Sequence, residues 1–158
     1  MAESLPKGSA IVYRAFGAAD AATVALRLKA IALRRGLKLM IGADEALAVE
    51  VGADGIHLPE RLVSNAVRIR ARHPTWLITA AAHSPRAARI QVDAVVVSAV
   101  FPSNSRSAGR PLGPLRLAQI VRQARSPVYA LGGVSQSTAA RLLATGVVGI
   151  AGVEVFRA

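Results

Sequence analysis

Short runs of continuous apolar residues alternate along the chain with segments in which apolar residues recur every three or four positions. Continuous apolar runs are typical of strands buried on both faces of a parallel sheet, and the longer period is typical of amphipathic helices. Strands that alternate with helices predict right-handed βαβ units and an α/β fold with a parallel sheet. The predicted strands are AIVYRAF, LKLMIG, GIHL, WLITAAAH, AVVVSAVF, PVYALGG and GIAGVEVF.

Helical patterns fill most of the intervals between these strands. The first has Val24, Leu28 and Ile31 on one face and ends at Gly36, and the helix near residue 84 starts at a Ser-Pro pair. Seven strands fit either an open doubly wound sheet or a (β/α)8 barrel that lacks a piece. Glycine-containing loops after the last two strands favour the barrel, because barrels commonly hold phosphate there. The predicted helical segments are 18–36, 44–55, 62–74, 84–90, 114–127 and 135–146.

Composition predicts a single domain over residues 1–158. The chain is 53% hydrophobic with a mean hydropathy of +0.40, and no composition shift divides it. Its apolar runs are too short to span a bilayer, and the N-terminal residues lack the apolar core of a secretion signal. We therefore expect a cytoplasmic protein with no membrane partner. The absence of cysteine excludes disulfides, thiolate metal ligands and cysteine nucleophiles.

The net charge of +11 indicates either a nucleic-acid partner or an anionic substrate. The arginines of the densest basic stretch, residues 61–73, recur at the spacing of the solvated face of a helix. Aromatic residues are 4% of the chain, which supplies few platforms for base stacking. Nucleic-acid binding is therefore not expected, and an anionic small molecule is the better partner.

Two strand ends carry candidate chemistry. Gly132-Gly133 joins a strand to the helix expected near Ser135, and the pair either admits a phosphate or makes a tight turn with no ligand. His83 closes the strand WLITAAAH, where it is either an acid–base group or a capping residue. His57 also ends a strand but more often serves structure there, and His73 at a helix end suits the helix dipole.

An ordered series of motifs resembles the thiamine-phosphate synthase and thiazole tautomerase superfamily from about Ile11 to the C-terminus. The series is VGADGIHLPE, AAHS, AVFPSNSRSAGRPLG, PVYALGGV and ATGVVGIAGVEVF. The resemblance implies a (β/α)8 barrel of which this chain lacks the first strand–helix unit and most of the last helix. It also implies that another copy of the chain, or the N-terminal segment, covers the open edges, so a homo-oligomer is expected. The synthases of this family join a pyrimidine diphosphate to a thiazole phosphate with Mg²⁺. The tautomerase branch aromatises the thiazole phosphate with a histidine.

Carried over residue by residue, the resemblance implies a catalytic role for His83. It also implies a set of phosphate-binding residues, which are Arg14, Ser103, Ser105, Arg106, Gly132, Gly133 and Gly152. Arg110 in the same loop as Arg106 is a further candidate. Phe16 stands where the family has a lysine, and Glu154 stands where a phosphate-binding serine is usual.

The family's Mg²⁺ site is depleted in this chain. Gly42-Ala43 replaces an Asn-Asp pair, which leaves Asp44 one position late, and Glu60 lies in a segment that lacks the usual aspartate. Mg²⁺ demands oxygen ligands in octahedral geometry, and Asp44 with Glu60 is a thin set. Metal-free tautomerase chemistry is therefore favoured over displacement of diphosphate. The alternative is a non-catalytic binding or regulatory relative that holds a phosphorylated thiazole or thiamine phosphate.

Overall fold

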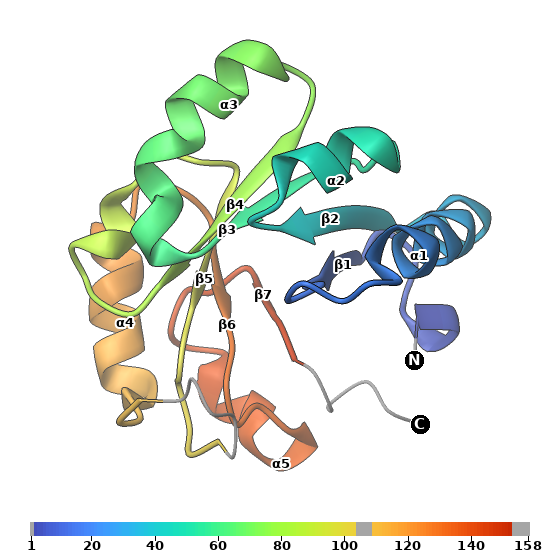
Figure 1. Cartoon of the computed structure of the whole chain (residues 1–158). Coiled ribbons are helices and arrows are strands. Elements are labelled where there is room, and N and C mark those ends of the chain that lie inside the picture. Colours follow the sequence, from blue (N-terminus) through green and yellow to red (C-terminus); the bar gives the residue numbers. More distant parts are fainter. Residues whose placement is uncertain (1, 104–108, 153–158) are drawn as a thin grey trace. The chain divides into compact units, whose positions relative to one another are not determined.

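The structure is a computed structural model that describes residues 2–103 and 109–152. The chain divides into two compact units, the first reaching to Ile78 and the second beginning at Thr79. Figure 1 traces both units along the chain. Each unit is built from consecutive strands and the helices between them.

All seven predicted strands form inside the apolar runs. In the first unit β1 pairs with β2 and β2 with β3, and in the second β4, β5, β6 and β7 pair in sequence, each pair parallel. This confirms the α/β class. The strands are Ala10–Tyr13 (β1), Lys38–Gly42 (β2), Gly55–Leu58 (β3), Leu77–Ala82 (β4), Ala94–Val97 (β5), Val128–Ala130 (β6) and Gly149–Ile150 (β7).

The helices are shorter than the patterns predict in the second half of the chain. The segment at 84–90 forms only a 3-10 turn, Ala87–Arg89, whose Ala87 N–H donates to Ser84 Oγ at 3.2 Å. The α-helices are Ala21–Arg35 (α1), Glu45–Glu50 (α2), Ala66–Arg72 (α3), Gly113–Gln123 (α4) and Gln136–Ala139 (α5). The other 3-10 turns are Ala2–Ser4 (η1), Glu60–Asn65 (η2) and Ala140–Leu142 (η4), the turn at Ala87–Arg89 being η3. None of the helices in residues 2–103 and 109–152 is long and apolar enough to cross a membrane.

In the first unit α1 and α2 cover strands whose central residues are fully buried. Leu39 and Ile41 of β2 are completely inaccessible and pack with Leu47 of α2. Helix α1 turns Ala25 and Ala32 fully inward, and the predicted face of Val24, Leu28 and Ile31 is only half-buried. Gly36 ends α1 in the left-handed conformation, as predicted, with φ of 65°.

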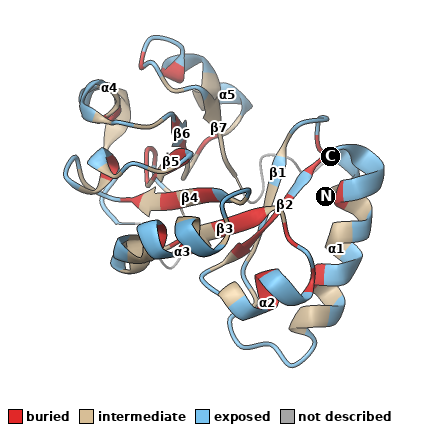
Figure 2. Ribbon diagram, turned by 90° about the horizontal axis from the view of Figure 1, so that it is seen from above, coloured by how far each residue is buried: buried red, intermediate tan, exposed pale blue. Residues whose placement is uncertain are grey.

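In the second unit the core lies between the strands and α4. Val95 and Val97 of β5 and Leu117 of α4 are fully buried, and Ile120 of α4 is nearly so. Figure 2 shows these buried segments in red, with the outward turns of the helices in pale blue. In both units the polar strand ends are the exposed part of the sheet, which is where ligands bind in parallel α/β proteins.

Candidate functional site

The strand ends of the first unit bring Arg14, Gly42 and His57 together. Arg14 follows β1, Gly42 ends β2, and His57 is the third residue of β3. A Cβ atom at Gly42 would lie 2.7 Å from Arg14 Cγ, so the arginine stem crosses the end of β2 where a side chain is absent. The Ala43 N–H donates to the His57 carbonyl at 2.9 Å, which joins the end of β2 to β3.

His57 is buried at this edge. Burial, together with the positive charge of Arg14, lowers the pKa of His57 to about 4. The imidazole is therefore neutral at physiological pH, so His57 adds no second cation beside Arg14. This agrees with the structural role expected for His57 and does not exclude a contact of the neutral ring with a ligand.

Asp44 acts as a helix cap. Its Oδ1 accepts the Leu47 N–H at 2.9 Å at the start of α2. Glu60 opens η2 after β3. No cluster of three or more His, Asp and Glu side chains within residues 2–103 and 109–152 could hold a metal ion. The donor set that the structure describes therefore does not fit the Mg²⁺ that the family uses.

His83 lies exposed immediately after β4, in the second unit. Its Nδ1 is 2.9 Å from the Ser98 carbonyl oxygen and 3.3 Å from the Ser98 hydroxyl. A carbonyl only accepts, so the contact assigns the proton to Nδ1 and makes Nε2 the basic nitrogen of the neutral ring. Ser98 follows β5, so this contact holds the ring at the ends of two neighbouring strands.

Gly132 and Gly133 follow β6 with φ of 93° and 62°. A Cβ atom at Gly133 would lie 2.2 Å from the Pro102 carbonyl oxygen and 2.8 Å from Phe101, and one at Gly132 would lie 2.9 Å from Ala99. The glycines thus let this loop approach the backbone that follows β5. That packing, whatever ligand binds, explains why neither position carries a side chain.

The turn after these glycines satisfies its own polar groups. Ser135 is the N-cap of α5, as predicted, and its N–H donates to Thr138 Oγ1 at 2.8 Å. Thr138 Oγ1 also donates to the Gly133 carbonyl at 3.2 Å. Helix α5 has only four residues before the chain continues as a 3-10 turn. The short helix supplies few free N–H groups, so the phosphate-binding prediction rests more on the loop side chains.

The remaining predicted residues divide between described and undescribed positions. Ser103 is half-buried two residues after Phe101, and Gly152 is half-buried two residues beyond β7. Arg110 is exposed. Ser105, Arg106 and Glu154 lie outside the described residues.

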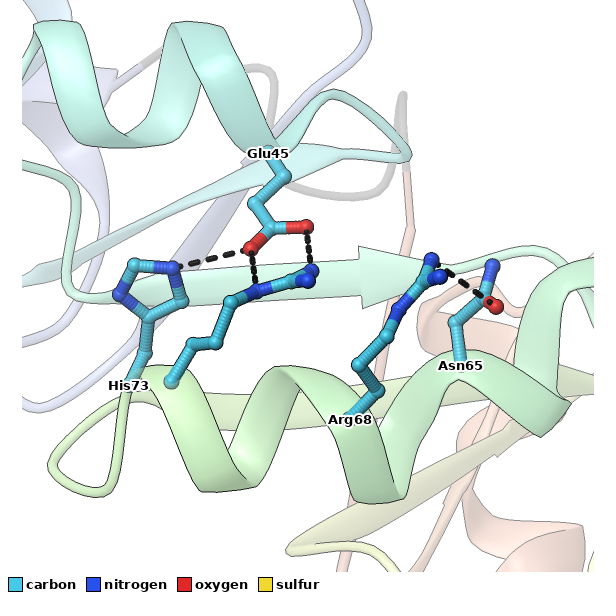
Figure 3. A network of polar contacts seen from close by, with 5 residues as sticks. Glu45, Asn65, Arg68 and His73 are labelled. Atoms are coloured by element: carbon cyan, nitrogen blue, oxygen red, sulfur yellow. Dashed lines mark hydrogen bonds and ion pairs between the residues drawn. The ribbon is translucent and has the colours of Figure 1, made fainter.

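Two polar clusters in the first unit were missed by the sequence analysis. Glu45 accepts two hydrogen bonds from Arg72 and lies 3.0 Å from His73 Nε2, which ties α2 to α3 (Figure 3). Figure 3 also shows Arg68 donating to Asn65 across one turn. The Arg72 hydrogen bond lowers the pKa of Glu45 against the opposing effect of burial. This cluster fastens one helix to another.

Asp54 forms the second cluster, just before β3. Its Oδ2 accepts the Leu39 N–H and a Lys29 ammonium proton, each at 2.9 Å. Burial raises the pKa of Asp54, but these hydrogen bonds outweigh it and the pKa is lowered. Lys29 lies 25 residues away in sequence, so no local pattern announces the contact.

A parallel α/β fold with polar groups at the strand ends describes a broad class of phosphate-ligand enzymes, and comparison with known proteins narrows it. A thiamine phosphate pyrophosphorylase from Pyrococcus furiosus superposes with a TM-score of 0.78 at 24% identity, over 96% of this chain and 74% of that one. This likeness establishes the fold.

Sequence comparison establishes the family. The model described as thiamine monophosphate synthase matches residues 2–156, and the chain belongs to that family. A provisionally named thiamine-phosphate synthase 2 of Aquifex aeolicus is 28% identical over 137 residues, or 84% of this chain and 73% of that protein. The thiamine-phosphate synthase of Lactococcus lactis strain SK11 is 28% identical over 134 residues, or 82% of this chain and 62% of that protein. The chain thus spans about three fifths to three quarters of these relatives.

Proposed function

We propose that this chain binds a phosphorylated thiazole or thiamine phosphate and moves a proton on the thiazole ring, with His83 as the acid–base group. The observation that carries the proposal is the contact between His83 Nδ1 and the Ser98 carbonyl. It fixes one ring nitrogen as a donor, which makes the other a proton acceptor. A general base needs a fixed, uncommitted lone pair near its substrate, and His is the residue best suited to exchange protons near neutral pH.

Tautomerisation needs only this exchange. The Nε2 atom takes a proton from one position of the ring, and the resulting imidazolium returns a proton to another. No bond between heavy atoms breaks, and the atoms and electrons balance without an oxidant. The Ser98 carbonyl stabilises the imidazolium because it accepts the Nδ1 proton throughout.

The phosphate of the ligand is assigned to the strand ends of the same unit. Gly132 and Gly133 bring the loop after β6 beside the segment that leads into Ser103. Hydroxyls, backbone N–H groups and an arginine are the donors that phosphate selects. Ser103, Ser105, Arg106 and Gly152 are proposed to complete this set, with the family resemblance as the support for the residues outside the described structure.

Displacement of diphosphate is the less supported reaction. It builds charge on the leaving group, which the family offsets with Mg²⁺, and Asp44 Oδ1 is instead committed to the Leu47 N–H. We assign no step to a metal ion. The same commitment of Asp44 favours, as a second candidate, a non-catalytic relative that binds the phosphorylated ligand and does not turn it over.

The test is the conversion of the thiazole phosphate tautomer, followed by ultraviolet absorbance in chelator. The wild type should convert it, and His83→Gln should be slower by about 10²–10⁴-fold, the usual contribution of a positioned acid–base group. His73→Gln is the matched control, since it removes an imidazole of the first unit and should keep the wild-type rate. Binding without conversion by the wild type supports the second candidate, and conversion at the same rate in His83→Gln contradicts the acid–base assignment.

A further inference from the structure

The strand ends of the first unit carry an arginine with an unusual setting. Arg14 is exposed, and in the described part of the chain no carboxylate pairs with it. Its guanidinium carbon lies 4.5 Å from the centre of the Phe16 ring, close enough for a cation–π interaction. Most exposed arginines sample many rotamers, so this contact is a restraint on where the charge stands.

Gly42 supplies a second restraint. The Arg14 stem occupies the space of a missing side chain, with Cγ 2.7 Å and Cβ 3.5 Å from the position of a Gly42 Cβ. Any larger residue there would push the stem off the end of β2. Phe16 on one side and the Gly42 gap on the other therefore hold the same cation.

The backbone around this cation is strained. Phe16 and Ala43 have φ of 50° and 64°, and they are the non-glycine residues with positive φ within residues 2–103 and 109–152. Both follow the carboxyl ends of adjacent strands, β1 and β2. Phe16 is also 82% exposed, which leaves its ring without a core to justify its conformation. Strain of this kind clusters at ligand sites, where the position of a side chain matters more than stability.

We propose that Phe16 and Gly42 are positioning residues that hold the Arg14 guanidinium at the ends of β1 and β2, where it binds a phosphate group without a divalent cation. The surroundings suit an anion. Arg14 brings a full charge, the neighbouring imidazole of His57 is neutral, and the carboxylate of Asp44 is occupied by the N–H of Leu47. A fixed guanidinium can donate two parallel hydrogen bonds to phosphate oxygens.

This inference shares with the proposed function only the class of ligand, a phosphorylated molecule. The acid–base proposal concerns His83 in the second unit, and this one concerns the first. Loss of one leaves the other intact, so separate measurements distinguish their failures.

The experiment is calorimetric titration of full-length protein with inorganic pyrophosphate, once in chelator and once with Mg²⁺. The wild type should bind in chelator, and Arg14→Gln should bind about tenfold or more weakly, the effect of losing a charge-assisted contact. Phe16→Leu should bind about two- to fivefold more weakly, as expected for an exposed cation–π pair, and Phe16→Tyr should restore binding. Gly42→Ala should weaken binding as well.

Arg27→Gln is the matched control, because Arg27 is an exposed arginine of α1 distant in sequence from the strand ends. It removes the same charge and should leave the affinity within about twofold of the wild type. The proposal is overturned if the wild type binds only with Mg²⁺ or not at all. It is equally overturned if Arg27→Gln weakens binding as much as Arg14→Gln, or if Phe16→Leu, with an unchanged melting temperature, binds like the wild type. His83→Gln should bind pyrophosphate at this site unchanged.

Discussion

Substitution of Gly133 by alanine tests why the strand β6 ends in two glycines. The new Cβ would lie 2.2 Å from the Pro102 carbonyl oxygen and 2.8 Å from Phe101, so one of the two backbone segments must move. Such overpacking typically costs about 1–3 kcal/mol. The positive φ of 62° adds about 1–2 kcal/mol for any residue with a Cβ. Gly133→Ala should therefore lower the free energy of unfolding by about 2–5 kcal/mol.

Gly113→Ala is the matched control in the same unit. Gly113 has a φ of 72° and no heavy atom within 4 Å of its Cβ position, so its substitution incurs the backbone cost alone. Each kcal/mol shifts the melting temperature of a chain of this size by about 2–4 °C. Thermal unfolding followed by circular dichroism should show a fall of about 4–20 °C for Gly133→Ala and about 2–8 °C for Gly113→Ala. Equal falls would refute the close approach of the two segments as the reason for Gly133.

Three further substitutions address the polar contacts of the first unit. Asp44→Ala should lower the free energy of unfolding by about 1 kcal/mol in urea titrations, the usual value of a helix cap, and added Mg²⁺ should not change the difference from the wild type. Asp54→Ala should lower it by about 2–4 kcal/mol at neutral pH, because the Leu39 N–H and the Lys29 ammonium lose a charged acceptor. The pKa of Asp54 is lower in the folded than in the unfolded chain, so this contribution is complete above about pH 4 and disappears as the pH falls through the folded-state value; a difference between wild type and variant that instead grows toward acid would contradict the assignment. Glu45→Gln should lower the free energy of unfolding by less than about 1 kcal/mol, because its ion pair with Arg72 is exposed, and a larger loss in the same titration would show that the pair does more than tie two helices.

The sequence predicts the strands well because buried parallel strands are continuous apolar runs that no other element here imitates. It also predicts the end of α1 at Gly36 and the N-cap at Ser135, since both depend on a residue's own backbone preference. The helix expected at Ser84 is reduced to one 3-10 turn. A seven-residue segment cannot repay helix nucleation without a covering partner, and pattern alone does not reveal that.

The candidate site is less accessible to sequence reasoning because its residue types serve several roles. Asp44 before a helical pattern is equally a metal ligand and a cap, and only the Leu47 N–H at 2.9 Å decides. The Gly132-Gly133 pair indicates a close approach, but the partner segment lies some 30 residues earlier. The contact of Arg14 with Phe16 depends on the left-handed conformation of Phe16, which phenylalanine does not favour on its own.

The most direct test of the proposed function is a measurement of pyrophosphate release. Wild-type protein is supplied with the pyrimidine diphosphate, the thiazole phosphate and Mg²⁺, and the same sample is assayed for conversion of the thiazole tautomer. The account predicts conversion that depends on His83 and no release of pyrophosphate above the rate without protein. Release that requires both Mg²⁺ and Asp44, and that Asp44→Ala abolishes in a folded sample, would contradict it.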